Sequence, residues 1–395
     1  MNPTTNRNPL LASLALAGLM AYVLACSSFS PDDSKIACPA FDPQTGDFGA
    51  AVYDRKSGRL EQVFSFGSMS GKPESKYKGC WTRMQWIDKN RLLVGWTGGD
   101  EDKALHVAVV PHGAAGPVRI WQIDDLSDPW PRLLTPFALA GNRLFVVVNK
   151  SNLVARLDLQ TGRIEHHLCA GDKIALYPAG RSEQIFYAAV YEASGAGQSD
   201  KLEFGTLDAG TFKQSLLLRT DNQDLNEQLA FSPDGRRIAT IIKRGEKKVL
   251  SILQAGKEAR TIPLPGGDEA DFEDGGLCFS PTQDVVFVSY QNVKSGETKA
   301  SLGVLTVPLD GKPIERTVLV PAIGGTNSNN APFFQATPSH DGMTLAVATS
   351  YFFGDPEKTQ GSAKDCALFL IDVTTRPHKI TRVPLALPKK DKPFK

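Results

Sequence analysis

The chain has 395 residues, of which 41% are hydrophobic and 22% are charged, a composition typical of a globular protein with a substantial core. This composition argues against collagen-like, coiled-coil and disordered chains. Lysine and arginine number 44 against 43 acidic residues, so the chain lacks the positive field that attracts a phosphate backbone, and no nucleic-acid partner is expected. The 35 glycines and 26 prolines predict many turns between many short elements.

The N-terminal residues 1–25 are predicted to form a signal peptide. Arg7 precedes an apolar run, Leu10–Ala25, which is short for a bilayer span of about 20 residues but suits a signal-peptide core. The run ends in Val23-Leu24-Ala25-Cys26, which resembles the bacterial lipobox. The resemblance implies cleavage before Cys26, lipidation of this cysteine and anchoring to a membrane through its acyl chains. The alternative is an uncleaved membrane anchor, since a single arginine precedes the core.

The segment after the lipobox is polar, and residues 26–35 are predicted to form the lipidated cysteine and a flexible tether. Ser27 directly after the cysteine resembles the signal that sorts lipoproteins to the outer membrane. If the source is Gram-negative, the chain is therefore expected to be an exported lipoprotein on the periplasmic side of the outer membrane.

After this leader, short apolar runs alternate with turn residues, and no convincing amphipathic helix is present. Three segments contain a strand, a tight turn and a second strand, at residues 228–242, 277–290 and 334–348. In the first, the turn is Phe231-Ser-Pro-Asp-Gly235, in which proline fixes φ and glycine permits the reversal. Weaker versions of this pattern occur at residues 84–96, 137–148 and 175–190.

Each hairpin is followed by a further strand and turn, which gives four antiparallel strands in a unit that recurs about every 40 to 60 residues. This pattern predicts an all-β fold: a single β-propeller over residues 36–388, with a basic disordered tail at residues 389–395. Seven four-stranded blades are expected, the first at residues 36–66. Eight blades are the alternative, because this first stretch contains two turn signals.

Two repeated motifs carry a family resemblance. Phe231-Ser-Pro-Asp-Gly235, followed by an apolar strand, resembles the repeats of TolB-type and related WD-like propellers. Leu157-Asp-Leu-Gln-Thr-Gly162 is similar to the turns of quinoprotein-type repeats, as in BamB-type assembly lipoproteins. The Trp-Asp dipeptide of strict WD repeats and the tryptophan that closes quinoprotein repeats are both absent. The resemblance implies an envelope scaffold that binds a protein or peptide.

Five cysteines follow Cys26, at Cys38, Cys80, Cys169, Cys278 and Cys366. They are widely spaced and include no C-x-x-C pair, so neither a zinc site nor a thioredoxin-like motif is predicted. An odd number in an oxidising compartment leaves at least one free thiol. A disulfide between Cys38 and Cys80 that closes the first blade is left open.

No catalytic motif is found. The nearest match to a hydrolase elbow is Gly67-Ser-Met-Ser-Gly71, in which Met69 occupies the nucleophile position. The Walker loop, the His-Glu-x-x-His motif and the dinucleotide fingerprint are also absent. We therefore expect a protein that is not an enzyme and that has no cofactor.

Packing or solvent-facing roles are expected for all six histidines. His166 and His167 are adjacent on a predicted strand, so they point to opposite faces and cannot easily share a metal ion. His340 lies in a predicted turn beside Asp341, where a hydrogen bond within the turn is expected.

Several predicted loops are acidic, and the loops between blades and in the middle of blades emerge on one face of a propeller. We expect either ordinary polar loops or a candidate face for a cationic partner; a calcium site is less favoured, because no loop has a recognised calcium spacing. The candidate residues are Asp100, Glu101, Asp102, Asp124, Asp125, Asp128, Asp221, Asp224, Asp268, Glu269, Asp271, Glu273 and Asp274.

The leading functional hypothesis is a monomeric, membrane-anchored propeller that acts as a non-catalytic scaffold for an envelope protein or peptide. The first alternative is a propeller enzyme, either lactonase-like or quinoprotein-like, which needs ligands that converge on the central channel. The second is a glycan-binding propeller that uses tryptophans crowded into one part of the chain, although core packing explains them more simply. These tryptophans are Trp81, Trp86, Trp96, Trp121 and Trp130.

Overall fold

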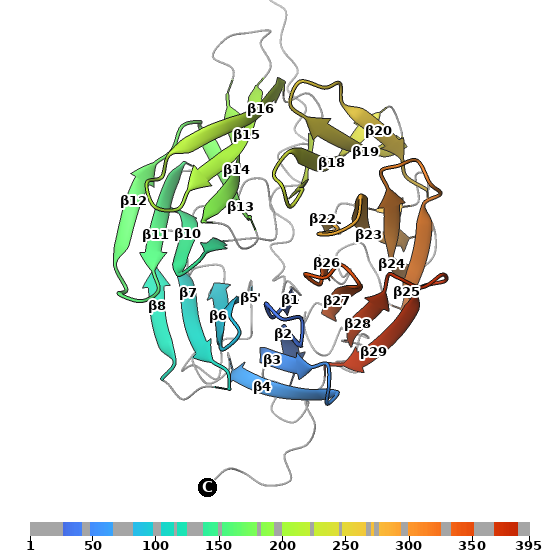
Figure 1. Ribbon diagram of the computed structural model, residues 1–395, viewed down its shortest axis with the longest axis horizontal. Coiled ribbons are helices and arrows are strands. Elements are labelled where there is room, and N and C mark those ends of the chain that lie inside the picture. Colours follow the sequence, from blue (N-terminus) through green and yellow to red (C-terminus); the bar gives the residue numbers. More distant parts are fainter. Residues whose placement is uncertain are drawn as a thin grey trace, which may run out of the picture.

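The structure is a computed structural model and consists of antiparallel sheets arranged in a ring (Figure 1). In the described part of the chain there is no helix, and so none that is long and apolar enough to cross a membrane. The described residues are 27–41, 48–65, 82–97, 104–113, 117–124, 137–148, 152–179, 183–192, 200–221, 225–244, 247–265, 270–271, 276–293, 299–324, 333–350 and 367–385.

Seven sheets form seven blades, and the strands of each blade run outward from the centre in chain order. Blade 1 contains β1 (Ser28–Phe29), β2 (Lys35–Phe41), β3 (Phe48–Asp54) and β4 (Arg59–Ser65). Blade 2 contains β5 (Thr82–Asp88), β6 (Arg91–Thr97), β7 (Leu105–Pro111) and β8 (Arg119–Ile123). Blade 3 contains β9 (Phe137–Ala140), β10 (Arg143–Val148), β11 (Leu153–Asp158) and β12 (Ile164–Leu168).

The remaining blades repeat this order. Blade 4 contains β13 (Lys173–Pro178), β14 (Gln184–Tyr191), β15 (Lys201–Asp208) and β16 (Gln214–Asp221). Blade 5 contains β17 (Leu225–Phe231), β18 (Arg237–Arg244), β19 (Lys247–Gln254) and β20 (Arg260–Pro263). Blade 6 contains β21 (Ala270–Asp271), β22 (Leu277–Phe279), β23 (Val285–Val293), β24 (Lys299–Pro308) and β25 (Glu315–Gly324). Blade 7 contains β26 (Phe333–Pro338), β27 (Thr344–Ser350), β28 (Ala367–Asp372) and β29 (Lys379–Pro384).

The predicted all-β propeller with seven blades is confirmed, and the alternative of eight blades is wrong. Blade 6 departs slightly from four strands, because β21 and β22 both pair with β23 and together form its inner edge. The hairpins predicted from the Ser-Pro-Asp-Gly motif and its variants are the inner hairpins of their blades. In blade 5, for example, Phe231 pairs with Ile238 across the turn.

The prediction of a flexible tether is wrong for residues 27–35. Ser28 and Phe29 form the innermost strand of blade 1 and pair with Ala37 and Ile36. Ser27, Ser30 and Asp33 are buried. The polar composition of this segment resembles that of a linker, but its side chains and backbone find partners in blades 2 and 7.

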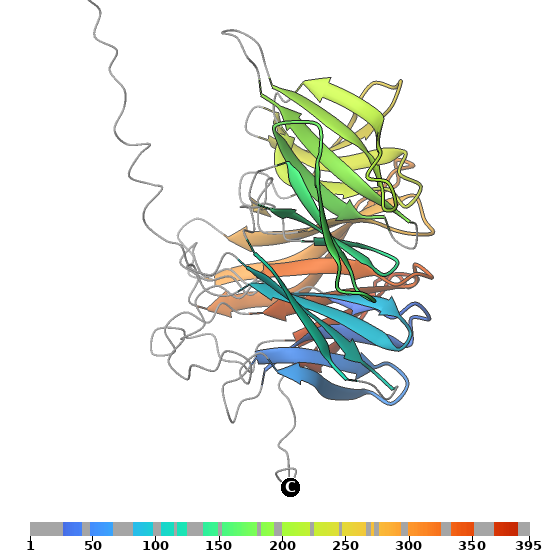
Figure 2. The same ribbon diagram turned by 90° about the vertical axis from the view of Figure 1, so that its left-hand side faces the viewer.

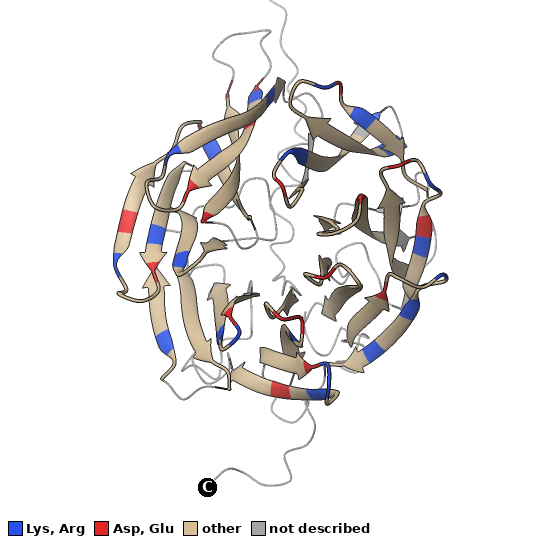
Figure 3. Ribbon diagram, viewed as in Figure 1, with Lys and Arg blue, Asp and Glu red and all other residues tan. Residues whose placement is uncertain are grey.

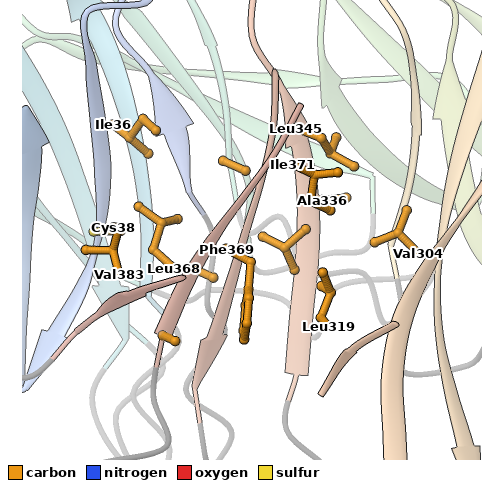
Figure 4. Close-up of a cluster of buried hydrophobic side chains, with 14 of the residues drawn as sticks. Ile36, Cys38, Val304, Leu319, Ala336, Leu345, Leu368, Phe369, Ile371 and Val383 are labelled. Carbon is orange, nitrogen blue, oxygen red and sulfur yellow. The ribbon is translucent and has the colours of Figure 1, made fainter. Parts of the chain in front are cut away.

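Among the described strands, none is shared between the two ends of the ring. All strands of blade 1 come from the N-terminal part of the chain, and all strands of blade 7 come from the C-terminal part. A large apolar cluster joins blades 1, 6 and 7 at this junction, and Figure 4 shows how its side chains interdigitate. It includes Ile36, Cys38, Val304, Leu319, Ala336, Leu345, Leu368, Phe369, Ile371 and Val383. Side-chain packing therefore contributes most of the contact at the closure.

Connections of two kinds lie at opposite ends of the strands (Figure 2). At one end, here called the turn face, tight turns join the first strand to the second and the third to the fourth; examples are residues 30–34, 54–58 and 232–236. At the other end, the loop face, connections join the second strand to the third and each blade to the next. The turn face is the better described of the two.

Candidate binding surface

The inner turns of blades 1, 5 and 7 are built in the same way around a serine and an aspartate. In blade 5, Ser232 Oγ donates to Asp234 Oδ1 (2.6 Å) and accepts from the backbone N–H of Arg237 (2.9 Å). Asp234 Oδ1 also accepts from the backbone N–H of Arg236 (3.1 Å). The same bonds link Ser30 with Asp32 and Ser339 with Asp341. These carboxylates are therefore occupied in shaping the turns.

The outer turns of several blades use a second aspartate motif. Asp54 Oδ1 accepts from the backbone N–H of Ser57 (2.7 Å), and Asp158 Oδ1 accepts from that of Thr161 (2.8 Å). Asp208 Oδ1 accepts in the same way from Thr211 (2.7 Å). An aspartate that bonds to the backbone two or three residues later stabilises a local turn.

These hydrogen bonds favour the ionised carboxylates. The hydroxyl of Ser30 is the main cause that lowers the pKa of Asp32 to about 2. The backbone N–H of Ser57 is the main cause that lowers the pKa of Asp54. For Asp234, partial burial raises the pKa, but the hydrogen bonds from Ser232 and Arg236 outweigh it, so the pKa falls. The turn face therefore carries fixed negative charges that are already hydrogen-bonded.

Figure 3 shows acidic residues on several inner turns around the centre of the turn face, whereas basic residues lie mainly farther out. Arg237 of blade 5 forms an ion pair with Asp284 of blade 6, and Arg91 pairs with Asp88 at 2.7 Å within blade 2. Among the described residues, no group of three or more His, Cys, Asp or Glu side chains could hold a metal ion. The carboxylates of this face thus serve the turns and the contacts between blades.

The acidic candidate residues fall almost entirely outside the described residues. Asp124 is described; it is exposed and accepts a hydrogen bond from Gln122 Nε2 (2.6 Å). Asp221 ends β16 and Asp271 ends β21, both at the loop face. Ten others lie outside the described ranges, so the acidic face stays a prediction: Asp100, Glu101, Asp102, Asp125, Asp128, Asp224, Asp268, Glu269, Glu273 and Asp274.

His340 contacts a different blade, so the prediction of a hydrogen bond within its own turn is wrong. Asp33 Oδ1 of blade 1 lies 2.7 Å from His340 Nδ1 and accepts from the His340 backbone N–H (2.9 Å). Asp33 Oδ2 accepts from the backbone N–H of Asp341 (3.0 Å). One carboxylate therefore links the first blade to the last.

His106, His167 and His378 pack against neighbours and His166 is exposed, in agreement with the predicted roles. His106 stacks on Trp96 with ring centroids 5.4 Å apart, and His167 stacks on Phe212 at 4.8 Å. The buried ring of His378 has Nε2 3.3 Å from Thr306 Oγ1 and 3.5 Å from Glu315 Oε1. The pairing of His378 with residues of blade 6 joins blades 6 and 7.

The described cysteines, together with Trp86 and Trp96, are part of the core. Cys38, Cys169 and Cys278 are free thiols, and burial raises the pKa of each to about 12. The Cys38–Cys80 disulfide therefore finds no support. Trp86 and Trp96 are buried, and Trp86 Nε1 donates to the Ser28 carbonyl (3.0 Å).

An exposed apolar surface lies at the outer rim between blades 2 and 3. Ile164 and Leu168 on the outermost strand β12 are 37% and 60% exposed. They pair with Leu157 and Leu153, which belong to the cluster between these blades, so they point toward blade 2. Trp121 on β8 packs against the same cluster from the opposite side. We call Trp121, Ile164 and Leu168 the rim surface.

The turn between β11 and β12 holds the two halves of the rim surface together. Arg119 Nη1 of blade 2 donates to the Gln160 carbonyl of blade 3 (3.1 Å). Gly162 has φ +76°, and a Cβ at this position would lie 2.8 Å from Trp121 Nε1. Glycine is therefore required for both the turn and the close approach of the indole.

The rim surface was missed at the sequence level, although a signal is present. The sequence Ile164-Glu-His-His-Leu168 places apolar residues at both ends of one face of a five-residue strand. When such a strand is the outermost strand of its blade, no further strand of the sheet covers its apolar side chains, and they stay exposed. Only the order of strands in the sheet shows which strand that is.

The chain was compared with known proteins. No family model matches the sequence, and no curated protein matches it. Solved structures do match. The β-propeller domain of the Trilobed protease from Pyrococcus furiosus, described as having an open velcro topology, is 9% identical with a TM-score of 0.53, covering 94% of this chain and all 100% of that chain. Puromycin hydrolase is 13% identical with a TM-score of 0.54, covering 96% of this chain and 56% of that chain.

TolB from Acinetobacter baumannii is also similar, with 15% identity, a TM-score of 0.43 and coverage of 72% of this chain and 64% of that chain. The chain therefore spans less than two thirds of both TolB and puromycin hydrolase. Identities this low show a shared fold and nothing about activity. At that level the predicted β-propeller is confirmed.

Proposed function

We propose that this chain is a lipid-anchored, non-catalytic platform of the cell envelope that binds a protein or peptide through its rim surface. The lipobox-like Val23-Leu-Ala-Cys26 supports export and anchoring. The propeller supplies a rigid frame, and exposed positions on rigid frames commonly serve recognition.

The observation that carries the binding proposal is the exposure of Ile164 and Leu168 beside Trp121. Interfaces are enriched in aromatic residues and depleted in charged ones at their centres. Leu168 is 60% exposed although it lies in a regular strand of a well-packed blade. As the outermost strand, β12 also has one edge without a strand partner in its sheet, which a peptide in extended conformation can use.

The environment of the described ionisable groups supports a role without catalysis. The aspartates of the turn face are hydrogen-bonded within their turns, and the described cysteine thiols are buried. Catalytic acids and nucleophiles instead need accessible groups with matched pKa values.

Site-specific photo-crosslinking from the rim surface in envelope extracts tests the proposal. We expect a crosslinked partner that is lost when Leu168→Lys or Ile164→Lys places a charge in the contact. Leu216→Lys is the matched control, because Leu216 is 55% exposed on the outermost strand of blade 4. If the partner is crosslinked equally by the Leu168→Lys, Ile164→Lys and Leu216→Lys variants, binding at the rim surface is contradicted.

The anchor is tested separately by the mass of the N-terminal peptide and by incorporation of labelled fatty acid. Both should show acylation of Cys26, and Cys26→Ser should abolish it. A mature chain that carries no acyl group would remove the anchor from the proposal and leave the binding surface in place.

A further inference from the structure

Two polar side chains, Arg119 and His166, project beside the apolar residues of the rim surface. We propose that the partner of the rim surface is an extended segment that carries carboxylates between apolar side chains and pairs with the outer edge of β12. This inference rests on the proposed function, because it names the chemistry of the ligand at the same surface. The apolar side chains of the segment contact the rim surface, and its carboxylates contact Arg119 and His166.

Three exposed side chains of β12 project from one face of blade 3. Ile164, His166 and Leu168 are exposed, whereas Glu165 and His167 between them are partly buried. The exposed residues pair with residues of β11 that line the apolar cluster between blades 2 and 3, namely Leu157, Ala155 and Leu153. Side chains alternate along a strand and directly paired residues share a face, so all three point toward blade 2. His166 therefore lies between two apolar contacts.

The side of β8 that faces blade 3 supplies the opposite part of this surface. Arg119 and Trp121 pair with Val109 and Val107, which belong to the same apolar cluster. Arg119 is exposed, and its Nη1 donates to the Gln160 carbonyl (3.1 Å). A guanidinium has five N–H groups, so this bond leaves others that can donate to a carboxylate of a ligand.

The charge of this surface is positive. Among the described residues of β7, β8, β11 and β12, those that point toward the cluster between blades 2 and 3 include Arg119 but no aspartate or glutamate. Glu165 projects from the opposite face of β12, where it pairs with Arg156 and with Arg163 (2.9 Å). Asp124 follows β8 and bonds to a side chain on the opposite face of that strand (2.6 Å). A segment with carboxylates complements this surface, and a segment with lysines does not.

The edge of β12 favours a ligand in extended conformation. β12 pairs with β11 on one edge, and in the described part of the chain no strand pairs with its other edge. An added strand places every second side chain on the face of Ile164, His166 and Leu168. These residues are two positions apart, so the matching pattern is apolar-x-acidic-x-apolar. The acidic side chain then lies opposite His166, whose ring N–H can donate to it.

A short peptide tests this pattern against the purified, full chain. The probe is Glu-Thr-Val-Thr-Glu-Thr-Val-Thr-Glu, blocked at both ends and labelled with a fluorophore. Its sequence is a palindrome, so it presents the same side chains in either strand direction. Three matched peptides have glutamine for glutamate, lysine for glutamate, or serine for valine, and a fourth carries N-methyl groups along its backbone. Fluorescence anisotropy at constant ionic strength measures each affinity.

We expect the glutamate peptide to bind about 10-fold more tightly than the glutamine peptide, because two carboxylate contacts at an exposed surface contribute about 3-fold each. The lysine, serine and N-methylated peptides should also bind more weakly than the glutamate peptide. The preference for glutamate over glutamine should fall to about 3-fold in Arg119→Met or His166→Phe and vanish in the double variant. Lys379→Gln is the matched control and should keep the full preference, because it removes an exposed positive charge from the outermost strand of blade 7.

The ratio of the two affinities separates ligand contact from support of the turn at Gln160. If the double variant keeps the full preference for glutamate, the inference is overturned. Equal binding of the glutamate and lysine peptides, full binding of the N-methylated peptide, or no binding at about 1 mM peptide would also overturn it. Crosslinking from the rim surface decides the proposed function independently. A partner captured there, together with any of these results, removes the acidic ligand and leaves the proposed function in place.

Discussion

Two glycines in turns of the turn face separate backbone strain from steric contact. Gly235 has φ +69°, and a Cβ there would lie 2.6 Å from Phe186 Cε1. Gly256 has nearly the same φ, +71°, but no heavy atom within 4 Å of that Cβ. Both positions favour glycine because L-residues rarely adopt a positive φ. Only Gly235 must also remain small, so that the aromatic ring of blade 4 can pack against the turn of blade 5.

We therefore predict different costs for alanine at the two positions. Gly256→Ala should lower the free energy of unfolding by about 1 kcal/mol, from backbone strain alone. Gly235→Ala should add a further ~1–3 kcal/mol, since Phe186 is buried and cannot move away freely. Urea unfolding of both variants measures the difference. Equal losses would show that the blade contact at Gly235 contributes nothing.

At the scale of elements, the junction of blades 1 and 7 depends on a residue that breaks the turn pattern. Asp33 stands where the equivalent inner turns have Gly235 and Gly342, and it has φ +56°. An aspartate in this conformation is strained. It is held there by its bonds to His340 and Asp341 across the junction.

The turn pattern alone predicts that Asp33→Gly stabilises the protein, whereas the structure predicts the opposite. The change relieves the backbone but leaves two backbone N–H groups at the junction without their charged acceptor, and such bonds contribute about 1.5–3 kcal/mol each. We expect a net loss of about 2–5 kcal/mol in the free energy of unfolding. Asp33→Asn, which retains a carbonyl acceptor, should lose less. A more stable Asp33→Gly variant would contradict the role of this contact.

Sequence patterns predicted the elements that form through residues close together in the sequence. The inner hairpins of blades 5 to 7 follow from a Ser-Pro-Asp-Gly turn or a variant of it between apolar runs, and all three are found. Strand β1 was missed although it is local: Ser28 and Phe29 pair with Ala37 and Ile36 across the turn Ser30-Pro-Asp-Asp33, and only these two residues form the strand. The bonds that fix Ser27 are not local, because its partners lie 310 and 319 residues away. The same distance effect explains His340, whose partner Asp33 is 307 residues away. The rim surface also depends on which strand is outermost, a property of the sheet and not of the strand.

At the scale of the whole molecule, packing and a few polar bonds join the two ends of the ring in the part of the chain that the structure describes. The apolar cluster of blades 1, 6 and 7 contributes the packing. Arg55 of blade 1 adds a bond from Nη2 to Thr344 Oγ1 of blade 7 (2.9 Å). The segment that carries Ser27 thus has two roles under our proposals: it closes the propeller and it joins the propeller to its membrane anchor.

The turn aspartates also make the stability of the whole ring depend on pH in a defined direction. Hydrogen bonds lower the pKa of Asp32 to about 2, and they lower the pKa values of other turn aspartates, namely Asp54, Asp158, Asp208, Asp234, Asp310, Asp341 and Asp372. In the unfolded chain these groups return to about 3.9. The unfolded state therefore binds more protons than the folded state at acidic pH, and protons favour unfolding.

We predict that the turn aspartates do not change the free energy of unfolding above about pH 5, where they are ionised in both states. The free energy of unfolding should fall from about pH 4 toward pH 2, as these aspartates are protonated. Urea unfolding at steps of pH measures this dependence, with ionic strength held constant. Replacing Asp32, Asp234 and Asp341 together by asparagine should lower the stability at neutral pH and flatten the acidic fall, because three of the groups that take up protons are gone. An acidic fall of the same steepness in the triple variant would mean that carboxylates outside the inner turns control the pH response.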